Sequence, residues 1–176
     1  SPEAQLIGAV NTVLNDNGKL IGYNTDGYGF MQSVRDAGHD ITGKNITVMG
    51  VGGASMAICA QSALDGAASV HIFARRTSRY WNRTQKFAEN LSAKTGCQVC
   101  LFDNDDHTAL RDSIAQSYLL INATSVGMVP DIDDTIIKDT SLFHPELVVA
   151  DVVYEPQETR LLREAKAAGC QTFNGM

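Results

Sequence analysis

The chain has 176 residues, of which 44% are hydrophobic, 19% charged and 7% aromatic. This composition fits one globular domain, or one domain with a piece of another, and argues against a disordered chain. Fourteen Lys and Arg residues against twenty Asp and Glu residues give a formal net charge of −6. An acidic chain is a poor binder of nucleic acid or anionic membranes, and the apolar runs are too short to cross a bilayer. We therefore expect neither partner.

The cysteines and the first residues give no sign of a metal-binding or secreted protein. Cys97 and Cys100 match C-x-x-C, but they lie in a predicted strand, where side chains three residues apart point to opposite faces. Neither Cys59 nor Cys170 completes a zinc-ligand pattern with them, so we expect no metal site. No signal peptide is visible at the start, and we expect a cytoplasmic protein.

The first part of the chain predicts a β-hairpin followed by a helix. Short apolar runs at 8–14 and 19–23 flank a turn-forming Asn-Asp-Asn-Gly sequence. Apolar side chains then recur at helical spacing, and Gly38 would end this helix. Either Thr25 or Asp26 would cap its beginning.

From residue 44 onward, the sequence alternates between apolar strands and amphipathic helices. Near-continuous apolar strands are typical of a parallel sheet covered on both faces, and right-handed crossovers then give a doubly wound, Rossmann-type α/β fold. We predict a dinucleotide-binding domain over 26–176 and interpret 1–25 as the tail of another domain, so the chain is expected to be a fragment. The predicted strands are 46–49, 69–73, 97–102, 118–121, 147–154 and 170–173, and the predicted helices are 54–64, 84–94, 108–116 and 158–168.

A glycine-rich turn joins the first strand of this alternation to the next helix. In the sequence GVGGAS, Gly50 permits a tight turn, and Gly52 lets the backbone approach a pyrophosphate. The helix that follows offers unpaired N–H groups and a partial positive charge to the phosphates. Ser55 replaces the third glycine of the usual fingerprint but is still small enough for close packing. We predict a dinucleotide site, with a plain glycine-rich turn as the alternative.

The segment after the second strand of the alternation should select the cofactor. A carboxylate there would bind the ribose 2′-hydroxyl of NAD, whereas arginine would bind the 2′-phosphate of NADP. No carboxylate follows this strand, but Arg75, Arg76 and Arg79 do, in a chain that is acidic overall. Their guanidinium groups can make bidentate contacts with a phosphate. We therefore predict NADP rather than NAD, with a solvated basic face as the alternative.

Four further motifs surround the glycine turn in a fixed order. GAVNT (8–12) and GYNTDG (22–27) precede it, while NATSVGM (122–128) and DVVYEP (151–156) follow it. Together they resemble the shikimate and quinate dehydrogenase family over essentially the whole chain. The resemblance implies an oxidoreductase that uses NADP or NAD to interconvert the ring hydroxyl of shikimate or quinate and a ketone, in the biosynthesis of chorismate and aromatic amino acids. It leaves a homodimer open.

The resemblance also implies roles for individual residues. Asn11 would bind substrate hydroxyls, and Tyr154 would approach the substrate. Asp26 would be the catalytic aspartate beside a lysine, a pair that can hold a hydroxyl and exchange its proton. On the residues alone, capping of the helix is the alternative role of Asp26. The pyrophosphate would be held by Gly52, Gly53 and Ala54, and the nicotinamide end would be lined by Thr124, Ser125, Val152 and Gly175.

The catalytic lysine of the family is missing from this sequence. In the family it lies in an Asn-Val-Thr-x-Pro-x-Lys segment upstream of GAVNT, and no lysine here has that setting. We therefore expect the chain to bind cofactor but to turn substrate over poorly or not at all. Two other functions stay open. One is a dinucleotide-binding sensor or regulatory domain without catalysis, and the other is a dehydrogenase of the methylene-tetrahydrofolate type, against which GYNTDG and NATSVGM count.

Overall fold

The computed structural model describes residues 1–175, and its main body is a parallel sheet of six strands. The strand order is β5-β4-β3-β6-β7-β8, so the chain winds from the central strand β3 first to one edge and then to the other. This order is that of a doubly wound dinucleotide-binding fold, and the predicted fold class is confirmed. The strands are β3 (Asn45–Met49), β4 (Ser69–Ala74), β5 (Gln98–Asp103), β6 (Leu119–Asn122), β7 (Val148–Asp151) and β8 (Gln171–Asn174).

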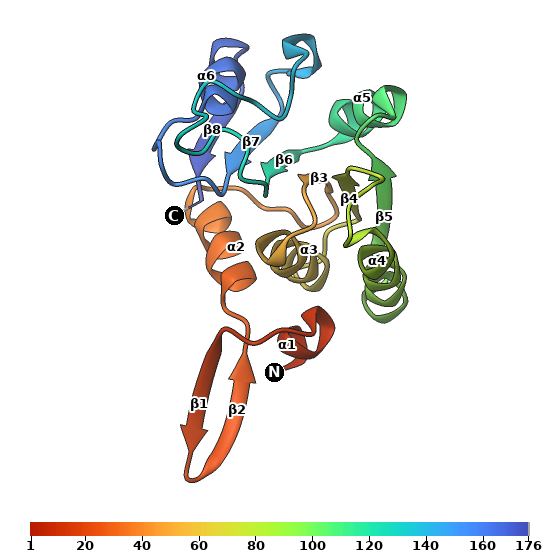
Figure 1. Cartoon of the computed structure of the whole chain (residues 1–176), viewed down its shortest axis with the longest axis vertical. Coiled ribbons are helices and arrows are strands. Elements are labelled where there is room, and N and C mark those ends of the chain that lie inside the picture. The colour runs from red at the N-terminus through yellow and green to blue at the C-terminus, as the bar shows by residue number, and fades with distance from the viewer. Residues whose placement is uncertain (176) are drawn as a thin grey trace.

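Helices cover both faces of the sheet (Figure 1). In β6, Leu119 and Ile121 pack into the core under α2, α3 and α4, while Leu120 packs into the core under α5 and α6. Both faces are therefore buried, which is why the strands read as continuous apolar runs. The helices are α2 (Asp26–Asp36), α3 (Gly53–Leu64), α4 (Trp81–Thr95), α5 (His107–Gln116) and α6 (Arg160–Ala167), with a short 3₁₀ turn at Thr140–Leu142.

The N-terminal segment stands apart from this body. It forms helix α1 (Pro2–Ile7) and an antiparallel hairpin of β1 (Thr12–Asp16) and β2 (Lys19–Tyr23), which projects away from the sheet (Figure 1). All residues of β1 are exposed, and Leu20 in β2 is 71% exposed. The hairpin thus offers an apolar surface that the described residues leave uncovered.

Several predicted boundaries are wrong, two of them for a clear local reason. The strand predicted from residue 8 begins at Thr12, because residues 2–7 form α1, which Ser1 caps and Gly8 ends with a φ of 70°. The strand predicted over 147–154 ends at Asp151, because its carboxylate accepts a hydrogen bond from the Val153 N–H at 2.9 Å and turns the chain out of the sheet. Helix α4 begins earlier than predicted, at Trp81.

Across residues 1–175, no helix is long and apolar enough to span a membrane. The same residues contain no group of three His, Cys, Asp or Glu side chains placed to hold a metal ion.

Candidate functional site

Two cavities open beside the glycine turn, at the carboxyl ends of the parallel strands. In doubly wound sheets, ligands bind at this edge, where the strand order reverses. The larger cavity has a volume of about 850 Å³ and is lined by Gly50 and Gly52 of the turn. The smaller cavity has a volume of about 380 Å³ and is lined by Ala54, in the first turn of α3. The glycine turn therefore lines the larger cavity, and the first turn of the helix that directly follows it lines the smaller one.

Gly50 is required by the backbone at this turn. Its φ is +111°, a conformation that L side chains rarely adopt. A Cβ atom there would lie 2.7 Å from the Ala123 carbonyl oxygen on the neighbouring strand's loop. The hydroxyl of the buried Ser55 donates a hydrogen bond to the Gly50 carbonyl at 2.6 Å. Ser55 therefore fixes the turn from below, which explains its presence where the fingerprint has glycine.

Gly52 is not required by conformation or by packing. It caps α3 with φ −78° and ψ −178°, angles that any residue adopts. A Cβ atom at Gly52 or Gly53 would meet nothing within 4 Å. No side chain caps this end of α3, so its first N–H groups remain available to a ligand. A phosphate can approach these uncapped N–H groups because the space in front of them is open. The start of α3 therefore fits the pyrophosphate of a dinucleotide.

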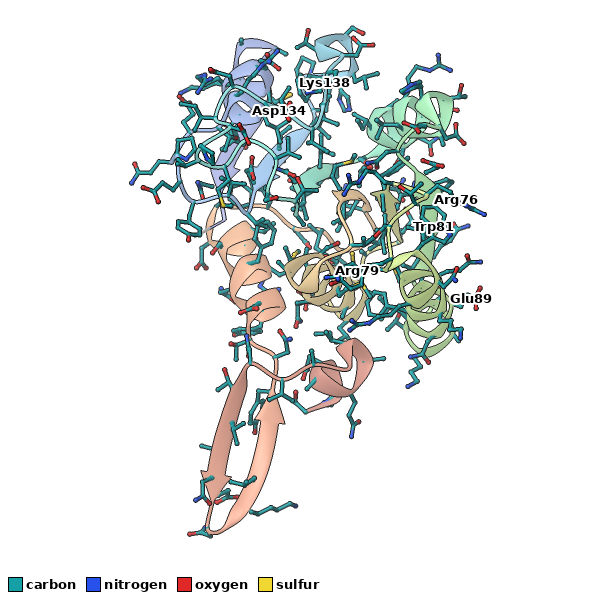
Figure 2. The ribbon with its side chains drawn as sticks, in the orientation of Figure 1. Arg76, Arg79, Trp81, Glu89, Asp134 and Lys138 are labelled. Atoms are coloured by element: carbon teal, nitrogen blue, oxygen red, sulfur yellow. The ribbon has the colours of Figure 1, made fainter. Side chains whose placement is uncertain are left out.

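The arginines after β4 separate into two groups. Arg75 and Arg79 line the larger cavity, and the Arg79 guanidinium lies 4.7 Å from the centroid of the Tyr80 ring. Arg76 does not line the cavity. Its guanidinium lies 4.7 Å from the centroid of the Trp81 ring, at the edge of the molecule seen in Figure 2. Of the three arginines proposed for the 2′-phosphate, two are thus positioned around the cavity.

A buried polar network, which the sequence analysis missed, holds the opposite wall of the larger cavity. Thr124 and Ser125 line that wall, and the Thr124 hydroxyl donates to the Asn122 side-chain oxygen at 2.6 Å. The Asn122 amide donates in turn to the fully buried Asp151 carboxylate at 3.0 Å. Asp151 also accepts the Thr159 hydroxyl at 2.7 Å. Burial raises the pKa of the Asp151 carboxyl above its ordinary value, although these hydrogen bonds oppose that shift.

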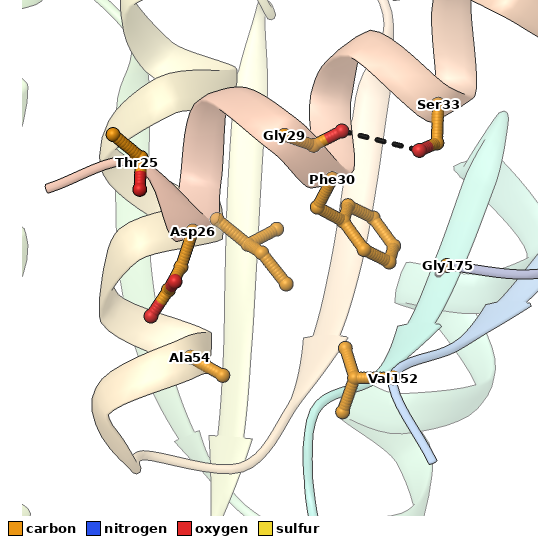
Figure 3. Close-up of a pocket in the computed structure, with 9 residues that line it drawn as sticks. Thr25, Asp26, Gly29, Phe30, Ser33, Ala54, Val152 and Gly175 are labelled. Atoms are coloured by element: carbon orange, nitrogen blue, oxygen red, sulfur yellow. Dashed lines mark hydrogen bonds between the residues drawn. The ribbon is translucent and has the colours of Figure 1, made fainter. Parts of the chain in front are cut away.

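The smaller cavity brings Asp26 to the glycine turn's side of the molecule. Figure 3 shows Asp26 and Ala54 on adjacent helices of one wall, with Val152 and Gly175 on the other wall. Gly175 packs closely here, since a Cβ atom on it would lie 2.2 Å from Cε2 of Phe30. Residues from the start of α2, the start of α3 and the ends of β7 and β8 therefore converge on one space.

Asp26 is held by the N-terminal segment. The Asn11 amide donates a hydrogen bond to the Asp26 carboxylate at 2.6 Å, and the Asn11 side-chain oxygen accepts the Thr25 N–H at 3.0 Å. The residue that caps α2 is Thr25, without a side-chain hydrogen bond, so Asp26 does not serve as the cap. Tyr154, by contrast, is 58% exposed and lines neither cavity. The geometry thus groups Asn11 with Asp26 and leaves Tyr154 outside.

No protein-family model matches the chain. It is 50% identical over all 176 residues to the NADP(+)-dependent shikimate dehydrogenase of Listeria innocua, covering 60% of that protein. It is 41% identical over 175 residues to the quinate/shikimate dehydrogenase of Escherichia coli, covering 99% of this chain and 60% of that protein. The chain therefore spans about 60% of the length of the curated relatives it matches.

Solved structures agree with these sequence matches. A crystal structure of shikimate 5-dehydrogenase from Listeria monocytogenes, in complex with shikimate and NAD, matches with a TM-score of 0.97 and 49% identity, covering 100% of this chain and 61% of that one. Quinate dehydrogenase from Corynebacterium glutamicum, in complex with NAD, matches with a TM-score of 0.84 and 32% identity. The match covers 99% of this chain and 60% of that one. The chain belongs to the shikimate and quinate dehydrogenase family and corresponds to the C-terminal part of its members.

Proposed function

We propose that the chain is the nucleotide-binding part of a dehydrogenase that interconverts shikimate and 3-dehydroshikimate, with quinate and 3-dehydroquinate as the alternative pair. The observation that carries this proposal is the shared cavity of Asp26 and Ala54, which brings a carboxylate beside the glycine turn. A dinucleotide held at that turn would have one end close to this carboxylate. A domain that only senses a dinucleotide has no need of such a group there.

NADP is the cofactor we propose, with NAD as the alternative. Its chemical contribution, when bound, is to accept or return a hydride. The uncapped N–H groups at Gly52, Gly53 and Ala54 would bind the pyrophosphate, and Arg75 and Arg79 would bind the 2′-phosphate. Both the name of the Listeria innocua relative, which specifies NADP(+), and the missing carboxylate after β4 support this choice. The nicotinamide end would lie among Thr124, Ser125, Val152 and Gly175.

Asp26 and Asn11 would bind the reacting part of the substrate. Oxidation of an alcohol releases a proton, so a positioned group must accept or relay it. The Asp26 carboxylate can accept a hydrogen bond from the substrate hydroxyl, while the Asn11 amide holds that carboxylate in place. Tyr154 remains a proposed substrate contact, reached from the exposed rim. The lysine that the family pairs with this aspartate would come from the part of the protein that this chain does not include.

The division of the chain follows the same reasoning. We propose that residues 1–25 belong to a substrate-binding domain and that 26–176 form the dinucleotide-binding domain. A two-stranded hairpin is marginally stable by itself, and β1 and β2 expose Val13, Leu14 and Leu20. A larger sheet in the complete protein would cover them. We also propose that this protein acts in the cytoplasm, in chorismate and aromatic amino acid biosynthesis.

Calorimetric titration of the 176-residue chain tests the proposal directly. We expect NADP to bind more tightly than NAD, and shikimate to be oxidised slowly or not at all. In the full-length protein, Asp26→Asn should lower kcat much more than it weakens NADP, because the carboxylate contacts the reacting hydroxyl. If the full-length protein binds NADP but oxidises neither shikimate nor quinate, a sensor domain is the correct function. Turnover by the 176-residue chain at full-length rates would contradict the proposed fragment.

A further inference from the structure

One face of α2 forms a wall of the smaller cavity. Thr25, Asp26, Gly29, Phe30 and Ser33 all line that cavity, and they recur at the three- and four-residue spacing that brings side chains to one helix face. Figure 3 shows α2 beside the helix that carries Ala54, with Val152 and Gly175 across the space. A residue on this face therefore sets the width of the cavity.

Gly29 is in the interior of α2 without a structural reason for being glycine. Its φ is not in the left-handed region, and a Cβ atom on it would meet nothing within 4 Å. Gly27 provides a contrast, because a Cβ atom there would lie 2.2 Å from the Ala57 carbonyl oxygen of α3. Glycine inside a helix lowers stability relative to alanine. Packing thus explains Gly27, whereas Gly29 weakens the helix and leaves only empty space in return.

The wall that carries Gly29 cannot readily move back. Gly27 fixes the start of α2 against α3, and the Phe30 ring lies 6.0 Å from the Phe173 ring, centroid to centroid. The Ser33 hydroxyl also donates a hydrogen bond to the Gly29 carbonyl at 3.1 Å, which helps to hold the backbone of α2 in place at Gly29. A methyl group added at Gly29 would therefore reduce the cavity instead of displacing the helix.

We propose that Gly29 is a specificity-determining residue that keeps the smaller cavity wide enough for the nicotinamide end of the dinucleotide. The proposal rests on the proposed function. The absence of a side chain at Gly29 lets a flat ring enter beside the Asp26 carboxylate, between the wall formed by α2 and Ala54 and the wall formed by Val152 and Gly175. Any side chain at this position would occupy that space and would exclude the ring while leaving the larger cavity unchanged.

The test compares two ligands on the 176-residue chain. NADP should require both cavities, whereas adenosine 2′,5′-bisphosphate lacks the nicotinamide half and should require only the larger one. Gly29→Ala should weaken NADP about tenfold, the usual effect of one methyl group in a fitted pocket, and leave the bisphosphate unchanged. The same variant should raise the Tm by about 1–4 °C, because alanine is the better helix former. Gly29→Leu should weaken NADP further.

Tyr28→Ala provides the matched control on the same helix. Tyr28 is 56% exposed and does not line the cavity, so its loss should leave the affinities for both ligands unchanged. Three results for Gly29→Ala would overturn the role of Gly29. They are an unchanged affinity for NADP, an equal loss of affinity for both ligands, and a lowered Tm. If the wild-type chain binds neither ligand, the proposed function fails together with this inference. If it binds both and the Gly29 variants do not differ from it, only the inference fails.

Discussion

The arginines after β4 give the sharpest prediction about the cofactor. Each charge-assisted contact to a phosphate contributes about 1.5–3 kcal/mol. Within residues 1–175, Arg75 has no ion-pair or aromatic partner, so that Arg75→Ala loses the whole contact. NADP should then bind more weakly by roughly 10- to 140-fold. NAD, which lacks the 2′-phosphate, should bind unchanged.

Arg79 should have a smaller effect, because it already has a partner. Its guanidinium lies over the Tyr80 ring and donates to the Tyr80 hydroxyl at 2.6 Å. Such stacking at an exposed site contributes about 0.5–1 kcal/mol, which is lost if the guanidinium moves to a phosphate. The net contribution is then about 0.5–2.5 kcal/mol, and Arg79→Ala should weaken NADP by roughly twofold to 60-fold.

Arg76→Ala is the matched control for both variants. It removes the same charge from the same segment, but its guanidinium lies over Trp81 and does not line the cavity. Calorimetric titration of all three variants with NADP and with NAD decides the matter. If Arg76→Ala weakens NADP binding as much as Arg75→Ala does, the ligand is attracted by a diffuse basic face, and no specific site binds the 2′-phosphate. Equal losses for NADP and NAD would refute 2′-phosphate recognition.

Two further predictions concern stability. Gly50→Ala combines an unfavourable φ with a backbone contact at 2.7 Å, so it should lower the free energy of unfolding by about 2–6 kcal/mol in urea titrations; an unchanged midpoint would contradict the close approach to Ala123. Asp151→Asn should remove a pH dependence. Because the folded state raises the pKa of Asp151 above the ordinary value of 3.8, wild-type stability from this group is greatest below 3.8 and decreases as the pH rises through the raised pKa. The difference in the free energy of unfolding between the asparagine variant and wild type should therefore favour the variant more at pH 7 than at pH 3. A difference that does not change with pH would argue against a titrating buried carboxyl.

Much of the fold could be predicted because both faces of the sheet are buried. Runs such as 147–150 are apolar throughout, and a glycine follows most of the helices between the strands, so element order and fold class could be predicted from the pattern alone. Helix α1 cannot be predicted with the same ease, although Ser1 and Pro2 are a helix-start signal, because its six residues are too few to show a helical period.

The site could be predicted only in part, because several contacts depend on side chains far apart in the sequence. The glycine turn has a local signature, but the Asn122–Asp151 bond joins neighbouring strands and no periodicity reveals it. Similarly, the sequence shows a cluster of arginines without showing which aromatic ring each one meets. In the structure, Arg76 lies over the Trp81 ring and Arg79 over the Tyr80 ring.

The position of Trp81 gives the chain a built-in optical reporter. It is the only tryptophan in the sequence, it is 8% exposed, and its backbone N–H donates to the Ser78 carbonyl at 3.0 Å. With Arg76 against its ring, the indole is tied to the segment that carries Arg75 and Arg79 (Figure 2). Indole emission responds to nearby charge and solvent, so ordering of this segment by a nucleotide should change the intrinsic fluorescence without any added label.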